Sequence, residues 1–314
     1  MGAPGMGRSQ RVCLAAAALI TIAGLAALAL DVGARAAPMH ADHGGVHTNI
    51  FVVPVAGGRP VRLTNNREME EDKLAYDPSW SPNGRRMVFT EVLCHSCTSG
   101  IHVMPARPLR GLNWLGRPIA YGFHPRWSPN GKLIVFVGLS GGINVMRPDG
   151  SHRRLIAKGG LANDGPTWSP DSRRIAFARQ ETATRWRLYV VRADGSGLRP
   201  LTSPRVSAVN PSWSPSGRRI AYAQSLGLWQ IFTVNLEGRV RKRVSNGRAS
   251  DSFPVWSPNG RRLAFVRQDG NATAVFTVGA TGRGIRRVSP RSMIAVQPAW
   301  SPNGSRIAFA GDHR

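Results

Sequence analysis

Cysteine is scarce in this chain, which has three in 314 residues, at Cys13, Cys94 and Cys97. Cys13 lies in an N-terminal segment that we expect to be removed, so the mature chain would keep one Cys-x-x-Cys pair in a hairpin loop. Two thiols in an oxidising compartment favour a small disulfide between Cys94 and Cys97. A metal site that also uses His95 and His102 ranks second. Redox catalysis ranks third, because its low thiol pKa depends on a helix N-terminus, which a hairpin loop does not supply.

Long apolar runs are also missing, with one exception near the N-terminus. Only the run from Val12 to Leu30 is long and apolar enough to cross a membrane. Arg8 and Arg11 precede it, and Ala34-Arg35-Ala36 offers small residues for a signal peptidase. We interpret residues 1–36 as a secretory signal peptide, with an uncleaved N-terminal anchor as the alternative. In both cases we expect the remainder outside the cytoplasm: periplasmic, associated with the cell wall, or secreted.

A short polar segment, residues 37–47, follows and carries His40, His43 and His47. Histidine is a common copper and zinc ligand, but nothing nearby in the sequence supplies an organised set of further ligands. We therefore interpret the segment as a solvated linker, and we expect neither a metal nor a cofactor in this protein.

Acidic residues and lysine are few. The chain has 17 Asp and Glu against 42 Lys and Arg, a formal net charge of +25, and lysine occurs only at Lys73, Lys132, Lys158 and Lys242. A protein this basic attracts polyanions or acidic protein surfaces in a salt-sensitive way. Aromatic residues make up 7% of the chain and form no evident platform for stacking bases, which argues against nucleic acid as the partner.

What the sequence does contain is a repeat. The unit Pro78-Ser79-Trp80-Ser81-Pro82-Asn83-Gly84 occurs six times in variant form, and each copy leads into basic residues and an apolar triplet such as Ile175-Ala176-Phe177. The tryptophans are 41 to 47 residues apart: Trp80, Trp127, Trp168, Trp213, Trp256 and Trp300. A period in the forties is typical of a propeller blade of four strands. Pro, Asn and Gly suit a tight hairpin turn, so Ser172, which replaces the Gly, predicts a strained turn.

A second hairpin completes each unit, and the two chain ends share one unit between them. The hairpin at about 48–65 lacks a first half, and the hairpin at about 298–310 lacks a second half. We infer that they pair into a composite blade, which would close the ring and remove exposed strand edges. The sequence therefore predicts an all-β protein: a monomeric six-bladed β-propeller of four-stranded antiparallel blades over residues 48–314.

The Trp-Ser-Pro-Asp/Asn-Gly-x-x-Ile-Ala-Phe unit, followed by a strand, Asp-Gly and Leu-Thr, resembles the repeat of the TolB-type, WD-repeat-like β-propeller family. The resemblance covers about residues 48–314 and implies the propeller fold. It does not specify a function, because that family includes scaffolds, binding modules and domains of enzymes. TolB itself has a further N-terminal domain, for which we expect no room here, so the partners of TolB are not carried over.

The arginines are expected to gather on one face of the ring. In an up-and-down blade, the turn between strands one and two lies on the same face as the turn between strands three and four. The first set of turns supplies the binding residues that we predict: Arg85, Arg86, Arg173, Arg174, Arg218, Arg219, Arg261 and Arg262. The candidate partners of this basic face are an acidic envelope protein, an anionic wall polymer or an anionic lipid surface. A solvated face without a partner is the alternative.

The residue before the proline of each repeat is expected at the mouth of the central channel. Four of these residues are polar: Asp77, His124, Asn210 and Gln297. They could bind a cation or a small polar ligand, as in propeller lyases that hold a metal with His and Gln, or they could only cap strands and solvate the channel. Gly138-Leu139-Ser140-Gly141-Gly142 matches the G-x-S-x-G hydrolase motif, but strands flank it on both sides, so we interpret it as a hairpin turn.

The sequence contains no convincing catalytic set. We predict an exported, non-enzymatic scaffold that binds a protein partner or an envelope polyanion through the basic face. A metal-assisted carbohydrate lyase or hydrolase at the channel mouth, and an envelope sensor anchored by residues 12–30, are the alternatives.

Overall fold

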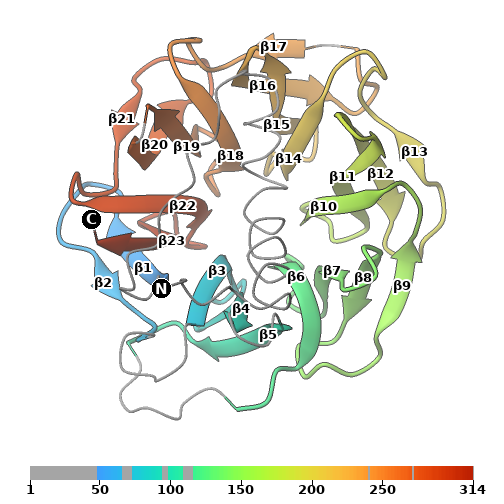
Figure 1. Cartoon of the computed structure of the whole chain (residues 1–314), viewed down its shortest axis with the longest axis horizontal. Coiled ribbons are helices and arrows are strands. Elements are labelled where there is room, and N and C mark those ends of the chain that lie inside the picture. The colour runs from blue at the N-terminus through green and yellow to red at the C-terminus, as the bar shows by residue number, and fades with distance from the viewer. Residues whose placement is uncertain are drawn as a thin grey trace, which may run out of the picture.

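The structure is a computed structural model that describes residues 48–65, 73–93, 98–108, 116–239, 241–270 and 272–313. Within these ranges the regular structure is β-strand, and none of it is a helix with the length and apolarity to span a membrane. The strands form antiparallel sheets that stand around a common centre (Figure 1). The all-β propeller with four-stranded antiparallel blades, predicted from the repeat, is confirmed.

Three sheets are each built from four consecutive strands, with the first strand innermost (Figure 1). The strands of the first are β10 (Ala162–Trp168), β11 (Arg174–Thr182), β12 (Arg185–Arg192) and β13 (Arg199–Pro200). Those of the second are β14 (Ala208–Trp213), β15 (Arg219–Leu226), β16 (Leu228–Asn235) and β17 (Arg241–Arg243). Those of the third are β18 (Ser250–Trp256), β19 (Arg262–Asp269), β20 (Ala272–Gly279) and β21 (Arg286–Arg287).

The two remaining sheets depart from this simple order. One contains seven strands in sequence order: β3 (Lys73–Trp80), β4 (Arg86–Leu93), β5 (Thr98–Pro105), β6 (Ala120–Trp127), β7 (Ile134–Gly138), β8 (Ile143–Met146) and β9 (Arg154–Ala157). The other has the order β2-β1-β23-β22: β1 (Asn49–Pro54), β2 (Val61–Arg62), β22 (Met293–Trp300) and β23 (Arg306–His313). In this sheet β1 pairs antiparallel with β23, so the first and last described strands lie side by side.

The repeated turn forms through its own side chains. Ser81 Oγ donates to Asn83 Oδ1 and accepts the N–H of Arg86, while Asn83 Oδ1 also accepts the N–H of Arg85. Gly84 takes a φ of 68°, which a side chain would strain. At the equivalent place Ser172 takes a φ of 59°, as the sequence predicted, and its Oγ accepts the N–H of Asn130 from the neighbouring repeat.

The apolar triplet after each turn supplies the centre of each sheet. The aromatic residue of each triplet has a relative exposure of 0–1%: Phe89, Phe136, Phe177, Tyr222, Phe265 and Phe309. The tryptophans join neighbouring sheets, because the indole N–H of Trp80 donates to the carbonyl of Ala299 and that of Trp168 to the carbonyl of Arg126. Trp300 donates in the same way to Val255, so three of the six repeat tryptophans supply polar contacts between repeats as well as buried area.

A Ser or Thr hydroxyl holds the second hairpin of several repeats. Thr64 Oγ1 accepts the buried N–H of Ile50, and Thr202 Oγ1 accepts that of Leu188 in the same way. Ser245 and Ser289 repeat the contact in two further sheets. The N-terminal hairpin is therefore held by the same bond as hairpins in the middle of the chain.

Thr64→Val is expected to lower the free energy of unfolding by about 1–3 kcal/mol, because it leaves the buried N–H of Ile50 without an acceptor. Thr202→Val removes the equivalent acceptor, that of the Leu188 N–H, in a sheet of consecutive strands. Thr64→Val should cost at least as much, because Thr64 Oγ1 also donates to Oδ1 of Asn49. Denaturant unfolding of both variants measures the two losses. If only Thr202→Val is destabilised, the N-terminal hairpin contributes little to the stability of the fold.

Candidate functional site

The innermost strands share a distortion at the residue before the proline. In each of them the register shifts at this point, for example between Tyr76 and Ser79 in β3. The residues before the proline all have a φ between 50° and 57°: Asp77, His124, Gly165, Asn210, Phe253 and Gln297. A left-handed residue inside a strand forms a bulge that turns its side chain to a new direction. The bulges thus explain why sequence-remote residues meet near the ring axis.

A central cavity of about 230 Å³ is lined by five of these six residues, all except Asp77. Asp77 is fully buried behind the wall, where its N–H donates to Oε1 of Gln297. Oδ1 of Asn210 is buried and has no hydrogen-bond partner among the described residues. Of the four polar residues predicted at the channel mouth, His124, Asn210 and Gln297 line the cavity, whereas Asp77 is buried and does not line it.

His124 on β6 lies between two carboxylates. Asp77 comes from β3 of the same seven-stranded sheet, and Asp164 comes from β10 of the next sheet. Nδ1 of His124 is 3.0 Å from Oδ2 of Asp77, and its Nε2 is 2.8 Å from Oδ1 of Asp164. The three side chains are no more than 10% exposed. Burial alone would lower the pKa of His124, but the carboxylates of Asp77 and Asp164 outweigh it and raise the pKa to about 10. His124 is therefore an imidazolium that joins three successive inner strands.

Arg126 completes this cluster. Its Nη1 donates to the backbone carbonyl of Asp77, and its Nη2 lies 3.8 Å from Oδ1 of the same residue. Burial would raise the pKa of Asp77, but His124 and then Arg126 outweigh it, so that pKa is lowered. Two cations thus balance two carboxylates. Both ring nitrogens of His124 face carboxylates, so neither offers a lone pair to a metal. Among the described residues, no His, Cys, Asp and Glu side chains are grouped so that three or more could hold a metal ion.

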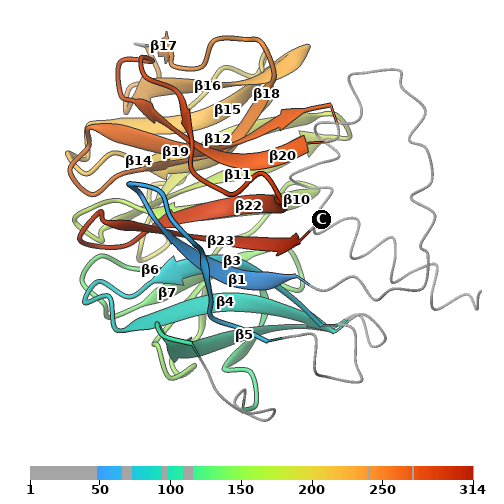
Figure 2. The same ribbon diagram turned by 90° about the vertical axis from the view of Figure 1, so that its left-hand side faces the viewer.

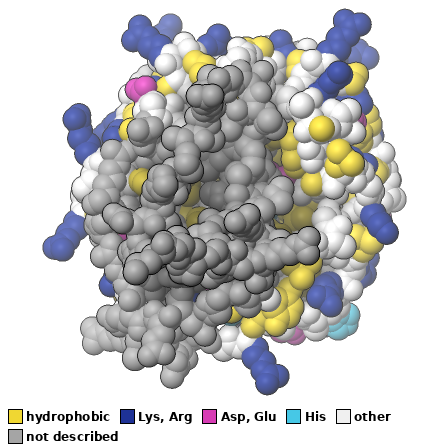
Figure 3. Space-filling view, viewed as in Figure 1, with side chains coloured by type: hydrophobic (Ala, Val, Ile, Leu, Met, Phe, Trp, Pro, Cys, Tyr) yellow, Lys and Arg dark blue, Asp and Glu magenta, His cyan; other side chains and the backbone are white. Residues whose placement is uncertain are grey.

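The two sets of turns that carry the predicted basic face are joined by backbone hydrogen bonds. The N–H of Ala106 donates to the carbonyl of Arg85, that of Ala193 to Arg173, and that of Ala280 to Arg261. The turn between strands three and four therefore lies against the turn between strands one and two. In Figure 2 the β22–β23 and β1–β2 turns both lie towards the left. The face shown in Figure 3 is the opposite one, with its visible Lys and Arg around the edge.

All eight arginines predicted for the basic face are exposed, and none forms an ion pair with another described residue. Two have neutral contacts: Arg86 lies over the Trp127 ring at 5.3 Å, and Nη1 of Arg262 donates to Oγ1 of Thr277. Other arginines of the same face have a structural task. Arg154, Arg199 and Arg286 each donate to a backbone carbonyl in the next turn along the ring.

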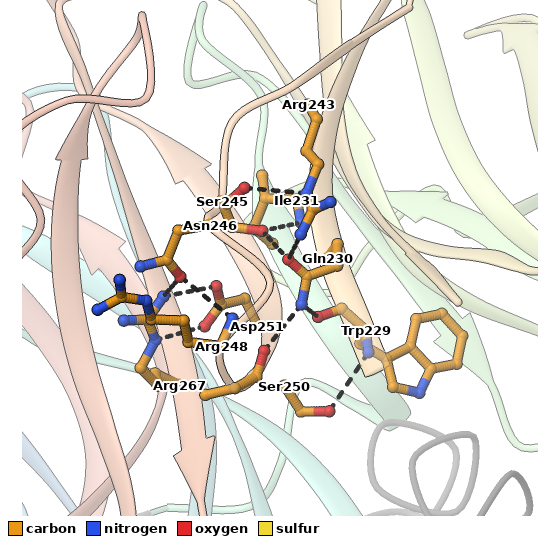
Figure 4. Close-up of polar contacts among 11 residues, drawn as sticks. Trp229, Gln230, Ile231, Arg243, Ser245, Asn246, Arg248, Ser250, Asp251 and Arg267 are labelled. Carbon is orange, nitrogen blue, oxygen red and sulfur yellow. Dashed lines mark hydrogen bonds and ion pairs between the residues drawn. The ribbon is translucent and has the colours of Figure 1, made fainter. Parts of the chain in front are cut away.

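A second buried charge lies away from the channel, between β18 and β19 (Figure 4). Asp251 is fully buried and accepts two hydrogen bonds from Arg267, from Nε at 2.7 Å and from Nη2 at 2.8 Å. Nη2 also donates to Asn246. Nε2 of Gln230 on β16 donates to the carbonyl of Trp229 on the same strand and to that of Ala249, which directly precedes β18. Burial raises the pKa of Asp251, and Arg267 acts in the opposite direction. These contacts tie the loop before β18 to two sheets, and both carboxylate oxygens of Asp251 are occupied by Arg267.

Four residues of these clusters were not predicted from the sequence: Asp164, Arg126, Asp251 and Arg267. Asp164 directly precedes the pre-proline residue Gly165, and Arg126 directly follows Pro125. These places next to the repeated proline were the only signal that the sequence offered. The G-x-S-x-G match is a hairpin turn between β7 and β8, as expected, since the N–H of Gly141 donates to the carbonyl of Gly138. Cys94, Cys97 and His95 lie outside the described residues. His102 is described, and its Nε2 lies 3.5 Å from Glu91.

Comparison with known proteins agrees with this architecture. The model of the TolB beta propeller domain matches residues 33–208 and 173–314. None of the curated proteins compared with the chain matches it in sequence. A putative TolB from Agrobacterium tumefaciens has a TM-score of 0.65 at 20% identity, over 84% of this chain and 97% of that one.

Two other solved structures are similar in fold. TolB from Acinetobacter baumannii has a TM-score of 0.61 at 16% identity, and the match spans 81% of this chain and 66% of that one. An oligogalacturonate lyase in complex with manganese has a TM-score of 0.55 at 10% identity, over 86% of this chain and 97% of that one. At these identities the likeness concerns the fold alone.

Proposed function

Because this chain belongs to the TolB β-propeller domain family, we propose that it is an exported, non-enzymatic scaffold that binds a protein partner or an envelope polyanion through its basic face. The observation that carries the proposal is the set of exposed guanidinium groups on the turns, which no described carboxylate neutralises. Exposed arginines recognise carboxylate and phosphate groups with two parallel hydrogen bonds, and a field of one sign speeds association.

The scaffold that we propose is a closed ring of six blades. A Cβ added at Gly84 would lie 3.8 Å from Pro302 of the last repeat, and one at Gly131 would lie 3.7 Å from Pro82. Three further pairs of adjacent repeats have the same contact: Gly217 with Pro170, Gly260 with Pro215 and Gly304 with Pro258. Between the sixth pair of repeats, the hydrogen bond from the N–H of Asn130 to Ser172 Oγ takes the place of this contact. In the seven-stranded sheet, β6 pairs with β5 through Ala120 and Tyr121 and with β7 from Gly122 onward, which supports its division into two blades.

The domain limits follow from the same proposal. Residues 1–36 are the signal peptide or anchor, residues 37–47 the linker and residues 48–314 the propeller, which functions outside the cytoplasm. N-terminal sequencing of the protein recovered from cells distinguishes a cleaved leader from an anchor, and an anchor would favour the role of an envelope sensor.

Charge reversal tests the basic face. Replacing Arg85, Arg173, Arg218 and Arg261 together by Glu is expected to reduce partner capture from envelope extracts at least tenfold, because four attractive charges become repulsive. The matched control reverses four exposed arginines towards the opposite face: Arg185 at the start of β12, and Arg205, Arg248 and Arg291 on loops between strands. Capture at low and high salt is compared for both. Capture that is equal in the two variants and insensitive to salt would contradict a role for the basic face.

A metal-assisted lyase or hydrolase acting on carbohydrate at the channel mouth is the alternative function. The fold shared with a manganese-bound oligogalacturonate lyase favours it, whereas the two carboxylates around His124 argue against metal binding by that residue. Metal analysis of the purified protein separates the alternatives. A stoichiometric metal that is lost in a His124→Ala variant would support the enzyme and count against the scaffold.

A further inference from the structure

An open groove of about 470 Å³ lies on the basic face, between the β18–β19 turn and the β22–β23 turn. The β1–β2 turn forms its third side, because the N–H of Val55 donates to the carbonyl of Ser305 in the β22–β23 turn. These turns lie towards the left in Figure 2. The groove is therefore built where the two ends of the described chain meet.

The lining of the groove combines positive charge with apolar surface. Arg261 and Arg262 supply the charge, and no Asp or Glu lines the groove. The apolar part consists of Val55, Pro258, Pro302 and Trp300. Nη1 of Arg262 is held by Oγ1 of Thr277, whereas the guanidinium of Arg261 forms no hydrogen bond or ion pair with the residues that the structure describes. Arg262 is thus held in place by the protein, whereas the guanidinium of Arg261 is available to bind a ligand.

We propose that this groove binds an acidic peptide segment in which carboxylate side chains stand next to a bulky apolar side chain. The inference rests on the proposed function and specifies its partner as a protein segment. Arg261 would hold a carboxylate through two parallel hydrogen bonds, while the apolar neighbour packs against Val55 and the prolines. An anionic polymer without apolar groups would gain from the charge of the face but nothing from the apolar wall. The groove therefore favours a peptide over such a polymer.

The test uses two fluorescein-labelled dodecapeptides of equal charge, one alternating Glu with Leu and the other alternating Glu with Ser. Fluorescence anisotropy with the mature protein is expected to show at least tenfold tighter binding of the Glu/Leu peptide, because only that peptide can fill the apolar wall. Equal affinities would overturn the proposal, because binding would then reflect charge alone.

Two pairs of variants locate the binding. Val55→Trp fills the groove without changing the charge, and Ala193→Trp places the same side chain at the equivalent turn of another sheet. We expect at least tenfold weaker Glu/Leu binding in the first and less than a twofold change in the second. Arg261→Glu should likewise weaken binding more than Arg218→Glu. Unchanged binding in Val55→Trp, or equal effects of the two charge reversals, would contradict the proposal that the peptide binds in this groove.

The same measurements separate this inference from the proposed function. If Val55→Trp keeps full affinity while the fourfold charge reversal abolishes capture, the basic face binds partners but the groove is not the site. If neither peptide binds and the fourfold reversal leaves capture unchanged, both proposals fail. Thermal unfolding of each variant shows whether its fold is intact.

Discussion

Replacing His124 by asparagine is expected to lower the free energy of unfolding near neutral pH by about 3–5 kcal/mol, because it leaves the buried carboxylates of Asp77 and Asp164 without the cation between them. Asparagine tolerates the left-handed backbone that His124 adopts at φ 53°, so the change removes the charge without adding backbone strain. For a domain of this size the melting temperature should fall by roughly 10 °C. Thermal and denaturant unfolding measure the loss.

The pH dependence gives a sharper readout than the loss itself. The pKa of His124 is raised from 6.5 to about 10, so the stability that its charge provides is fully present below pH 6.5 and is lost as pH rises through about 10. The lowered pKa of Asp77 has the opposite sense: its contribution is present above pH 3.8 and is lost as pH falls below that value. The wild-type protein should therefore lose stability between pH 7 and 10, and the His124→Asn variant should not.

His152 offers a matched control for this experiment. It also has a φ of 53°, but it is exposed and its Nδ1 contacts only the hydroxyl of Ser151. His152→Asn should change the free energy of unfolding by less than about 0.5 kcal/mol. Equal losses in the two variants, or a wild-type protein as stable at pH 10 as at pH 7, would contradict an imidazolium at position 124.

The fold could be predicted from sequence because its information is local and repeated. The Ser81–Asn83 hydrogen bond, the φ of Gly84 and the buried Phe89 all lie within ten residues, and the same chemistry recurs in later copies. Even the exception was predictable, since Ser172 keeps the left-handed backbone of the Gly that it replaces. The pairing of β1 with β23 was also indicated by the sequence, because each hairpin lacked a partner.

The candidate site was only partly predictable, because it depends on contacts between repeats. Asp77 and His124 were selected as pre-proline residues, but Asp164 stands one position earlier in its repeat and was missed. A period of about forty residues specifies which positions are equivalent, not which side chains touch across the ring. The distance from Nε2 of His124 to Asp164 is set by how β6 packs beside β10, and no residue within either strand determines it.

Pairs that face each other within one sheet were missed for a different reason. Asp251 and Arg267 are 16 residues apart and stand opposite each other in the β18–β19 register. An isolated Asp near a strand start is compatible with an exposed loop end, so composition did not reveal that it is buried. Only the register, together with the loop that covers it, shows that the carboxylate needs a cation.

Removing that cation should have the second large effect on stability. Arg267→Ala is expected to cost about 3–5 kcal/mol, because Asp251 is fully buried and loses both hydrogen bonds from the guanidinium. Part of the loss comes from packing, since Arg267 also lies over the Phe265 and Phe276 rings at 5.4 Å. The control must therefore be an arginine that stacks on two aromatic rings in the same way but has no buried carboxylate as its partner.

Arg179 provides that control, because it occupies the equivalent position of another sheet. It lies over the Phe177 and Tyr189 rings, as Arg267 does over its own pair, but its Nε donates to the neutral amide of Asn163. Arg179→Ala should cost only about 1 kcal/mol. The excess loss in Arg267→Ala should shrink as pH falls, since the uncompensated Asp251 can then take up a proton. Adding Asp251→Asn to Arg267→Ala should also recover most of this excess loss of stability. Equal losses in Arg267→Ala and Arg179→Ala would show that Arg267 stabilises the fold by stacking on the rings and not by compensating the buried carboxylate.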